Sequence, residues 1–118
     1  MEAGHALTSP LGRITISSGV IAQIVAETAL ECYGVVGMKG SLRGRIAPGK
    51  ARARGIEIGR DRDDGVTVDL HVVVEYGLNL AEVASSVRNR VAYEVERLTG
   101  LSVRAVEVHV DAVKTSGK

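Results

Sequence analysis

The fold is decided by residues 66–111, which read VTVDLHVVVE (66–75), YGLN (76–79), LAEVASSVRNRVAYEVERLTG (80–100) and LSVRAVEVHVD (101–111). Apolar residues alternate with polar ones along 66–75 and again along 106–111, as is typical of strands with one buried face. Arg104 has the same parity as Val106, so the last strand, about 103–110, either begins after Val103 or contains a β-bulge. The pattern predicts a strand on each side of residues 76–102.

A helix is predicted between these two strands. Its apolar stripe consists of Val83, Val87, Val91, Val95 and Leu98, spaced by three or four residues. Asn79 and Glu82 resemble a capping box, and Gly100 is suited to end the helix in a left-handed conformation. Residues 66–111 therefore predict a strand–helix–strand unit.

The residues before this unit predict a further helix and further short strands. Residues 12–16 form a short β-type run, and Ser17 or Ser18 is placed to cap a helix that ends near Gly34. Further short strands are predicted at 35–38 and from residue 55, and the turn-forming run 61–65 joins the latter to residue 66 as a β-hairpin.

The predicted class is α+β, a single domain in the order β-α-β-β-β-α-β with two helices packed on one face of a mixed sheet. We expect residues 1–11 to be a disordered leader, 12–113 to form the domain, and 114–118 to be a tail. Within the domain, residues 39–54 are expected to form a basic mobile loop, since glycines and a proline interrupt regular structure there.

Composition limits the classes of function. The chain has 118 residues, 45% of them hydrophobic and 25% charged, with a net charge of +1, so its overall charge gives no attraction to nucleic acid or membranes. Its single cysteine, Cys32, excludes an intramolecular disulfide and is interpreted as a small buried hydrophobe. We find no secretory signal and no apolar run long enough to span a membrane, and we expect a cytoplasmic protein.

The basic segment is the candidate for anion or phosphate contact. Its cations are Lys39, Arg43, Arg45, Lys50, Arg52 and Arg54, and it contains no acidic residue. Nucleic acid and anionic lipid are both open as ligands, while a simple solvated loop is the favoured interpretation. Residues 44–51 approach a phosphate-binding P-loop, but Ala51 replaces the Ser or Thr that would bind Mg²⁺, which disfavours nucleotide hydrolysis.

The two strands of the 66–111 unit carry a second polar set, consisting of Asp69, His71, Glu107, His109 and Asp111. If the strands are neighbours, two imidazoles and several carboxylates come together, which is one way to build a metal site. The favoured interpretation is an ordinary solvated sheet face with charged cross-strand pairs. We therefore expect no catalytic, cofactor-binding or metal-ligating residues, and no cofactor.

Several segments, in their order and spacing, resemble the alkaline shock protein family of Gram-positive bacteria. They are residues 12–16, 34–38, 72–79 (VVVEYGLN), 98–101 (LTGL) and 106–111 (VEVHVD). The likeness extends over about residues 12–113. The resemblance implies a small cytosolic protein that is not an enzyme and is linked to cell-envelope homeostasis and to alkaline or general stress. It also implies that some relatives are held at the membrane by a partner protein.

The expected function is a non-enzymatic interaction or scaffold module acting through protein–protein contacts. The expected partner is a protein, with a membrane-anchored protein and a second copy of the chain as the two alternatives. Binding of nucleic acid or anionic lipid through residues 39–54 is the alternative function. Membrane association through a partner, without a transmembrane segment, would be compatible with the cytoplasmic location.

Overall fold

The computed structural model describes residues 4–38, 55–62 and 64–115 of the chain. The elements are β1 (Gly4–Ser9), β2 (Gly12–Ser17), α1 (Ser18–Glu31), β3 (Val35–Met38), β4 (Ile56–Arg60), β5 (Val66–Glu75), α2 (Leu80–Thr99) and β6 (Val103–Lys114). The predicted α+β class is confirmed, and from β2 onward the elements follow the predicted order.

Strand β5 is the centre of the main sheet. Strand β6 runs parallel to it along one edge. The other edge is shared by two antiparallel strands, because β4 pairs with residues 66–70 of β5 and β3 pairs with residues 72–74. The sheet is therefore mixed, as predicted, with its longest strand pairing between β5 and β6.

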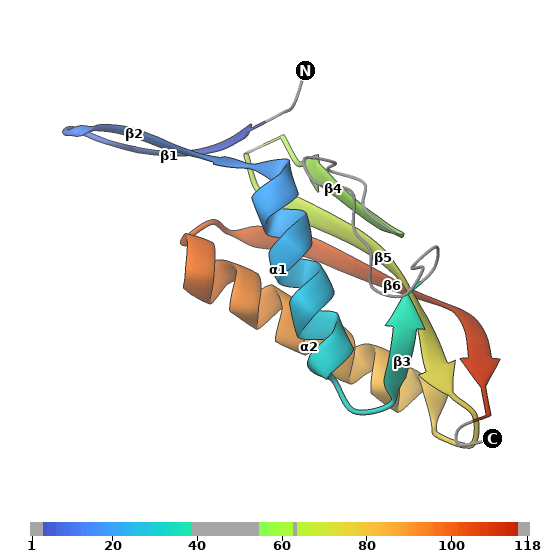
Figure 1. The fold of residues 1–118 in the computed structure, drawn as a ribbon. Coiled ribbons are helices and arrows are strands. Elements are labelled where there is room, and N and C mark those ends of the chain that lie inside the picture. Colours follow the sequence, from blue (N-terminus) through green and yellow to red (C-terminus); the bar gives the residue numbers. More distant parts are fainter. Residues whose placement is uncertain (1–3, 39–54, 63, 116–118) are drawn as a thin grey trace.

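Both helices lie on the same face of this sheet (Figure 1). The side chains of β5 that point toward the helices are fully or almost fully buried, and they are Val66, Val68, Leu70, Val72 and Val74. They meet Ile21 and Val25 of α1 and the valines of α2 in one aliphatic core. The alternate residues of β5 point to the opposite face, which no helix in the described part of the chain covers.

Helix α2 begins and ends where the sequence predicted. Asn79 Oδ1 accepts a hydrogen bond of 3.1 Å from the Glu82 amide. At the other end Gly100 has a φ of +80°, and its amide donates to the Glu96 carbonyl over 2.9 Å. Both contacts satisfy backbone groups that a helix end otherwise leaves without partners.

One residue of the predicted α2 stripe is placed differently. Val83, Val87, Val91 and Val95 are buried, but Leu98 is 55% exposed. Positions four residues apart advance by about 40° around a helix, so a buried line that follows this spacing continues to Thr99 and leaves Leu98 roughly 100° away. Thr99 is buried and its hydroxyl donates to the Val95 carbonyl.

The N-terminal segment also differs from expectation. Residues 1–11 were predicted to be a disordered leader, whereas Gly4–Ser9 forms β1, an antiparallel partner of β2. The segment has little β-propensity of its own, and its backbone is held by pairing with β2 and by burial of His5. The Ser17 hydroxyl accepts from the Val20 amide, so Ser17 is the cap of α1.

Strand β6 contains two irregularities in its pairing with β5. Arg104 is skipped between the pairs Val66–Val103 and Thr67–Ala105, which confirms the bulge considered from the sequence. Asp111 is skipped in the same way before Ala112 pairs with Val73, and the strand continues to Lys114 rather than stopping near Val110. Between the two skipped residues the strands stay in continuous register.

Candidate functional site

The open face of the main sheet carries the polar set noted in the sequence. Parallel pairing of β5 and β6 sets Asp69 opposite Glu107 and His71 opposite His109. Across the other edge of β5, Glu57 of β4 lies opposite Asp69. The structure therefore brings these residues together on one surface, because alternate residues of neighbouring strands point to the same side of a sheet.

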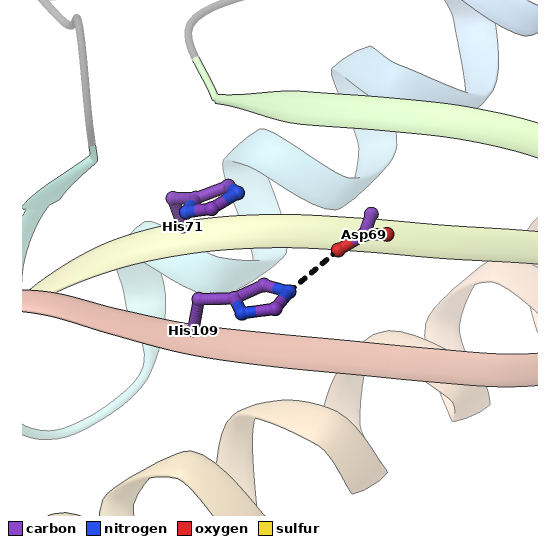
Figure 2. A group of neighbouring side chains, drawn as sticks. All are labelled: Asp69, His71 and His109. Carbon is purple, nitrogen blue, oxygen red and sulfur yellow. Dashed lines mark hydrogen bonds and ion pairs between the residues drawn. The ribbon is translucent and has the colours of Figure 1, made fainter.

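The two imidazoles are stacked. Their ring centroids are 4.4 Å apart and the ring planes differ by 14°. Figure 2 shows both rings on the same face, with the ring of His109 directed at Asp69 of the neighbouring strand. Two side chains in direct register on adjacent strands are close enough for this contact without any distortion of the backbone.

Each imidazole has a carboxylate partner. His109 Nε2 is 2.7 Å from Asp69 Oδ1 and 3.9 Å from Glu107 Oε1. His71 Nδ1 is 2.9 Å from Asp111 Oδ2. Asp111 is the skipped residue of the second β6 irregularity, and a bulge re-aims the side chain that it carries.

The surface beside the histidines is hollowed. An open depression of about 400 Å³ is lined by Glu57, Ile58, Gly59, Thr67, Val68, Asp69, Ala105 and Glu107. The lining includes the small residues Gly59 and Ala105 and the carboxylates of Glu57, Asp69 and Glu107. The depression is thus acidic in character and adjoins the two imidazoles through Asp69.

One ligand atom from each of Asp69, His71 and His109 can be chosen so that all lie within 4.8 Å of one another. Imidazole nitrogens and carboxylate oxygens are the donors that zinc and similar cations take from proteins. The sequence alone favoured a solvated face with cross-strand charge pairs. The two His–Asp pairs agree with that interpretation. In addition, the three donors are clustered closely enough for one cation to be bound by all of them.

The β1–β2 hairpin is a second candidate surface. It extends from the N-terminal end of α1 away from the main sheet (Figure 1). Leu11 at its turn is 99% exposed and Ile14 on β2 is 63% exposed. Leu7, which pairs with Ile14, and Ile16, nearer the base, are partly buried against the core. The hairpin therefore leaves apolar side chains exposed at its turn and on β2 although part of it packs on the domain.

His5 fixes the base of the hairpin. It is 2% exposed, and its Nε2 lies 3.0 Å from the Ser18 hydroxyl at the start of α1. Burial lowers the pKa of His5, and the nearby positive charge of Arg60 lowers it further, while Asp64 acts in the opposite direction. This role could not be predicted from local sequence patterns, because His5 becomes buried only when β1 pairs with β2.

Cys32 is placed as the sequence predicted. Its side chain is buried and its Sγ donates to the Thr28 carbonyl over 3.4 Å. Burial raises the pKa of the thiol, with a smaller opposing contribution from Arg90. Since the thiolate is the reactive form, this environment makes Cys32 a poor nucleophile.

The predicted anion-binding residues lie outside the described part of the chain. They are Lys39, Arg43, Arg45, Lys50, Arg52 and Arg54. Contact of this segment with nucleic acid or anionic lipid stays a prediction from the sequence.

The fold and these surfaces define a small α+β domain with an open polar sheet face and a projecting hairpin. Residues 6–115 match the model of the alkaline shock protein 23 family, whose described function is related to the cell envelope. The chain belongs to this family, which confirms the resemblance noted in the sequence.

Relatives align over most of the chain. YloU of Bacillus subtilis (strain 168) is 32% identical, with 93% of this chain and 95% of YloU covered. YqhY of the same organism is 29% identical over 92% of this chain and 82% of its own. A protein named as a stress response regulator gls24 homolog, from Streptococcus pyogenes serotype M3, is 31% identical over 92% of this chain and 63% of its own.

A solved MamM CTD chain overlaps 83% of this chain and 85% of its own length, with 12% identity and a TM-score of 0.48. Among the described residues, no helix combines the length and the apolar character that crossing a bilayer requires.

Proposed function

We propose that this protein is a non-enzymatic interaction module with a role in cell-envelope homeostasis and stress, acting through protein–protein contacts. The β1–β2 hairpin is the observation that supports it. Leu11 and Ile14 expose apolar side chains on a part of the molecule that projects from the main sheet. Aliphatic side chains gain about 1.5–3 kcal/mol each on full burial, so covering these two residues would favour association.

The backbone of the hairpin also favours a contact with another chain. Strands β1 and β2 pair with each other and with no other strand in the described part of the chain. An isolated two-stranded hairpin is at best marginally stable in water. Its outer edges offer amide and carbonyl groups to an added strand, which is a common mode of protein recognition.

The remaining parts of the proposal draw support from the family. Its described cell-envelope-related function supports the envelope role, and the names of the gls24 homologues support the stress role. A non-enzymatic function agrees with the buried thiol of Cys32, whose raised pKa disfavours nucleophilic chemistry. A cytoplasmic location with recruitment to the membrane by an anchored partner belongs to the same proposal.

Site-specific photo-crosslinking tests the hairpin contact in the native cells. A crosslinking amino acid at Leu11 should give a protein adduct, and Ile14→Lys in the same chain should reduce its yield at least about tenfold, since a buried lysine charge opposes association. The control carries the crosslinker at Leu98, which is similarly apolar and 55% exposed but lies on α2.

The mass of the adduct identifies the occupant. An adduct of twice the mass of the chain indicates a second copy, and any other mass indicates a different protein. Equal yields from Leu11 and Leu98, or no adduct from Leu11, would overturn the assignment of the hairpin as the contact surface.

A further inference from the structure

The open sheet face holds donors that the interaction proposal does not use. We propose that Asp69, His71 and His109 bind one divalent transition-metal cation of the zinc class. The three residues come from the middle of β5 and β6, and their ligand atoms cluster within 4.8 Å. Ligands mounted on regular strands are held more firmly than ligands on loops.

Strand register is the first support for the site. His71 and His109 are directly paired in the parallel ladder, and this stretch of the ladder is uninterrupted from Thr67 to Val72. The register therefore fixes both imidazoles side by side, with centroids 4.4 Å apart. A cation that binds both rings needs side-chain rotation and no change in strand pairing.

The second support is the tautomer that Asp111 selects for His71. The Asp111 carboxylate accepts the hydrogen bond from His71 Nδ1 over 2.9 Å. The proton is then on Nδ1, and Nε2 keeps its lone pair for a metal. A ligating histidine that donates its other nitrogen to a carboxylate is the usual arrangement in metalloproteins, and Asp111 is accordingly a positioning residue.

The third support is the contact between His109 and Asp69. The 2.7 Å between His109 Nε2 and Asp69 Oδ1 is a direct hydrogen bond, in which Nε2 carries the proton of the neutral imidazole. A cation that binds Nε2 takes the place of this proton, which moves to Nδ1. Two ligand atoms about 2.0–2.1 Å from a tetrahedral cation are roughly 3.3 Å apart, so the pair must open by less than 1 Å. Their side chains are 43% and 45% exposed, which leaves them room to do so.

The donor set also indicates the class of metal. Two imidazole nitrogens with one carboxylate suit Zn²⁺, Cu²⁺ or Ni²⁺, whereas Mg²⁺ and Ca²⁺ prefer sites made of oxygen donors. Glu107 Oε1 is 3.9 Å from His109 Nε2 and is placed to serve as a fourth donor, in competition with water. With Glu107 bound, two carboxylates balance the charge of a divalent ion.

Calorimetric titration of the untagged full-length chain with Zn²⁺ tests the site, with Mg²⁺ titrated separately. We expect one Zn²⁺ per chain and no heat from Mg²⁺. His71→Gln, His109→Gln and Asp69→Asn should each weaken Zn²⁺ binding by more than tenfold, since each removes a ligand. Asp111→Asn should weaken it by about 10–100-fold through loss of orientation of His71.

Glu27→Gln is the matched control, because Glu27 is an exposed carboxylate on α1, away from the open face. It should bind Zn²⁺ like the unchanged chain. Circular dichroism of every variant separates loss of ligands from loss of fold. A Co²⁺ absorption spectrum of the unchanged chain reports the coordination geometry of the bound ion. Absence of stoichiometric Zn²⁺ binding, or binding that folded His71→Gln and His109→Gln variants retain, would overturn the proposal. A hairpin variant, Ile14→Lys, should keep Zn²⁺ binding, so this result is independent of the proposed protein contact.

Discussion

His71 and His109 lie directly opposite each other on parallel strands, with their rings stacked at 4.4 Å. The two skipped residues of β6, Arg104 and Asp111, lie on either side of this pair. The bulge at Arg104 places Val106 and Val108 toward the helices and His109 on the open face. The bulge at Asp111 brings the Asp111 carboxylate to His71. Strand β6 thus supplies both core residues and part of the polar cluster, and its bulges decide which side chains point to each face of the sheet.

The α2 helix provides a direct test of the core. Val91→Ala should lower the free energy of unfolding by about 2–3 kcal/mol, because it removes two buried methyl groups and leaves a cavity. Leu98→Ala removes more atoms but from an exposed position. It should cost less than about 1 kcal/mol. Urea unfolding monitored by circular dichroism measures both, and a larger loss for Leu98→Ala than for Val91→Ala would contradict the placement of the buried stripe.

The start of α2 should depend on its cap. Asn79→Ala removes the side-chain oxygen that accepts from the Glu82 amide, and should destabilise the protein by about 1 kcal/mol. Asn89→Ala is the matched control, since Asn89 is exposed inside the same helix, where alanine has the higher propensity. Thermal unfolding should show a lower Tm for Asn79→Ala and an unchanged or slightly higher Tm for Asn89→Ala. The reverse order would show that Asn79 is not the cap.

The pH dependence of stability should carry a contribution from His5. Its pKa is lowered in the folded protein, chiefly by burial, from an ordinary value of 6.5. As the pH falls below that value, His5 becomes protonated in the unfolded chain while it stays neutral in the folded chain. The stability contributed by neutral His5 is therefore complete above about pH 6.5 and declines at lower pH, until the lowered folded pKa is reached.

Urea unfolding between pH 8 and pH 5 measures this contribution. His5→Gln should flatten the decline of the unfolding free energy with falling pH, whatever its effect at pH 8. His71→Gln, on the open face, should leave the His5 contribution in place. A pH profile for His5→Gln that is parallel to that of the unchanged chain would rule out this role.

The basic segment makes a prediction that rests on sequence alone. If it contacts phosphates, binding to anionic lipid vesicles or to RNA should weaken steeply between about 50 and 500 mM salt, because screening and counterion release oppose ionic contacts. Replacing Arg43, Arg45 and Lys50 with Gln should abolish binding. Replacing Arg88, Arg90 and Arg97 of α2 with Gln, which removes the same number of charges, is the charge-matched control. Binding that does not change with salt concentration would exclude the segment as the contact. An equal loss of binding in the two sets of variants would exclude it as well.

Local features of the chain were predictable because their causes are local. Alternation of apolar residues predicts β5, and the Asn79 cap and Gly100 bound α2, since capping and left-handed turns involve only neighbouring residues. The parity of Arg104 indicated the bulge for the same reason. Features that depend on distant pairing were not predicted, notably strand β1, whose backbone is satisfied by β2, and the burial of His5.

The sequence by itself determined the α+β class, the family, the buried face of β5, the buried valines of α2 and the presence of two histidines among carboxylates on the outward positions of two strands. Only the tertiary structure decided that β5 and β6 are parallel neighbours in a register that stacks His71 on His109, and that Asp111 bonds to one ring and Asp69 to the other. The physical reason is that hydrophobic patterning specifies which side of a strand is buried, whereas strand order and register arise from packing the whole core. A one-residue difference in register would have separated the imidazoles.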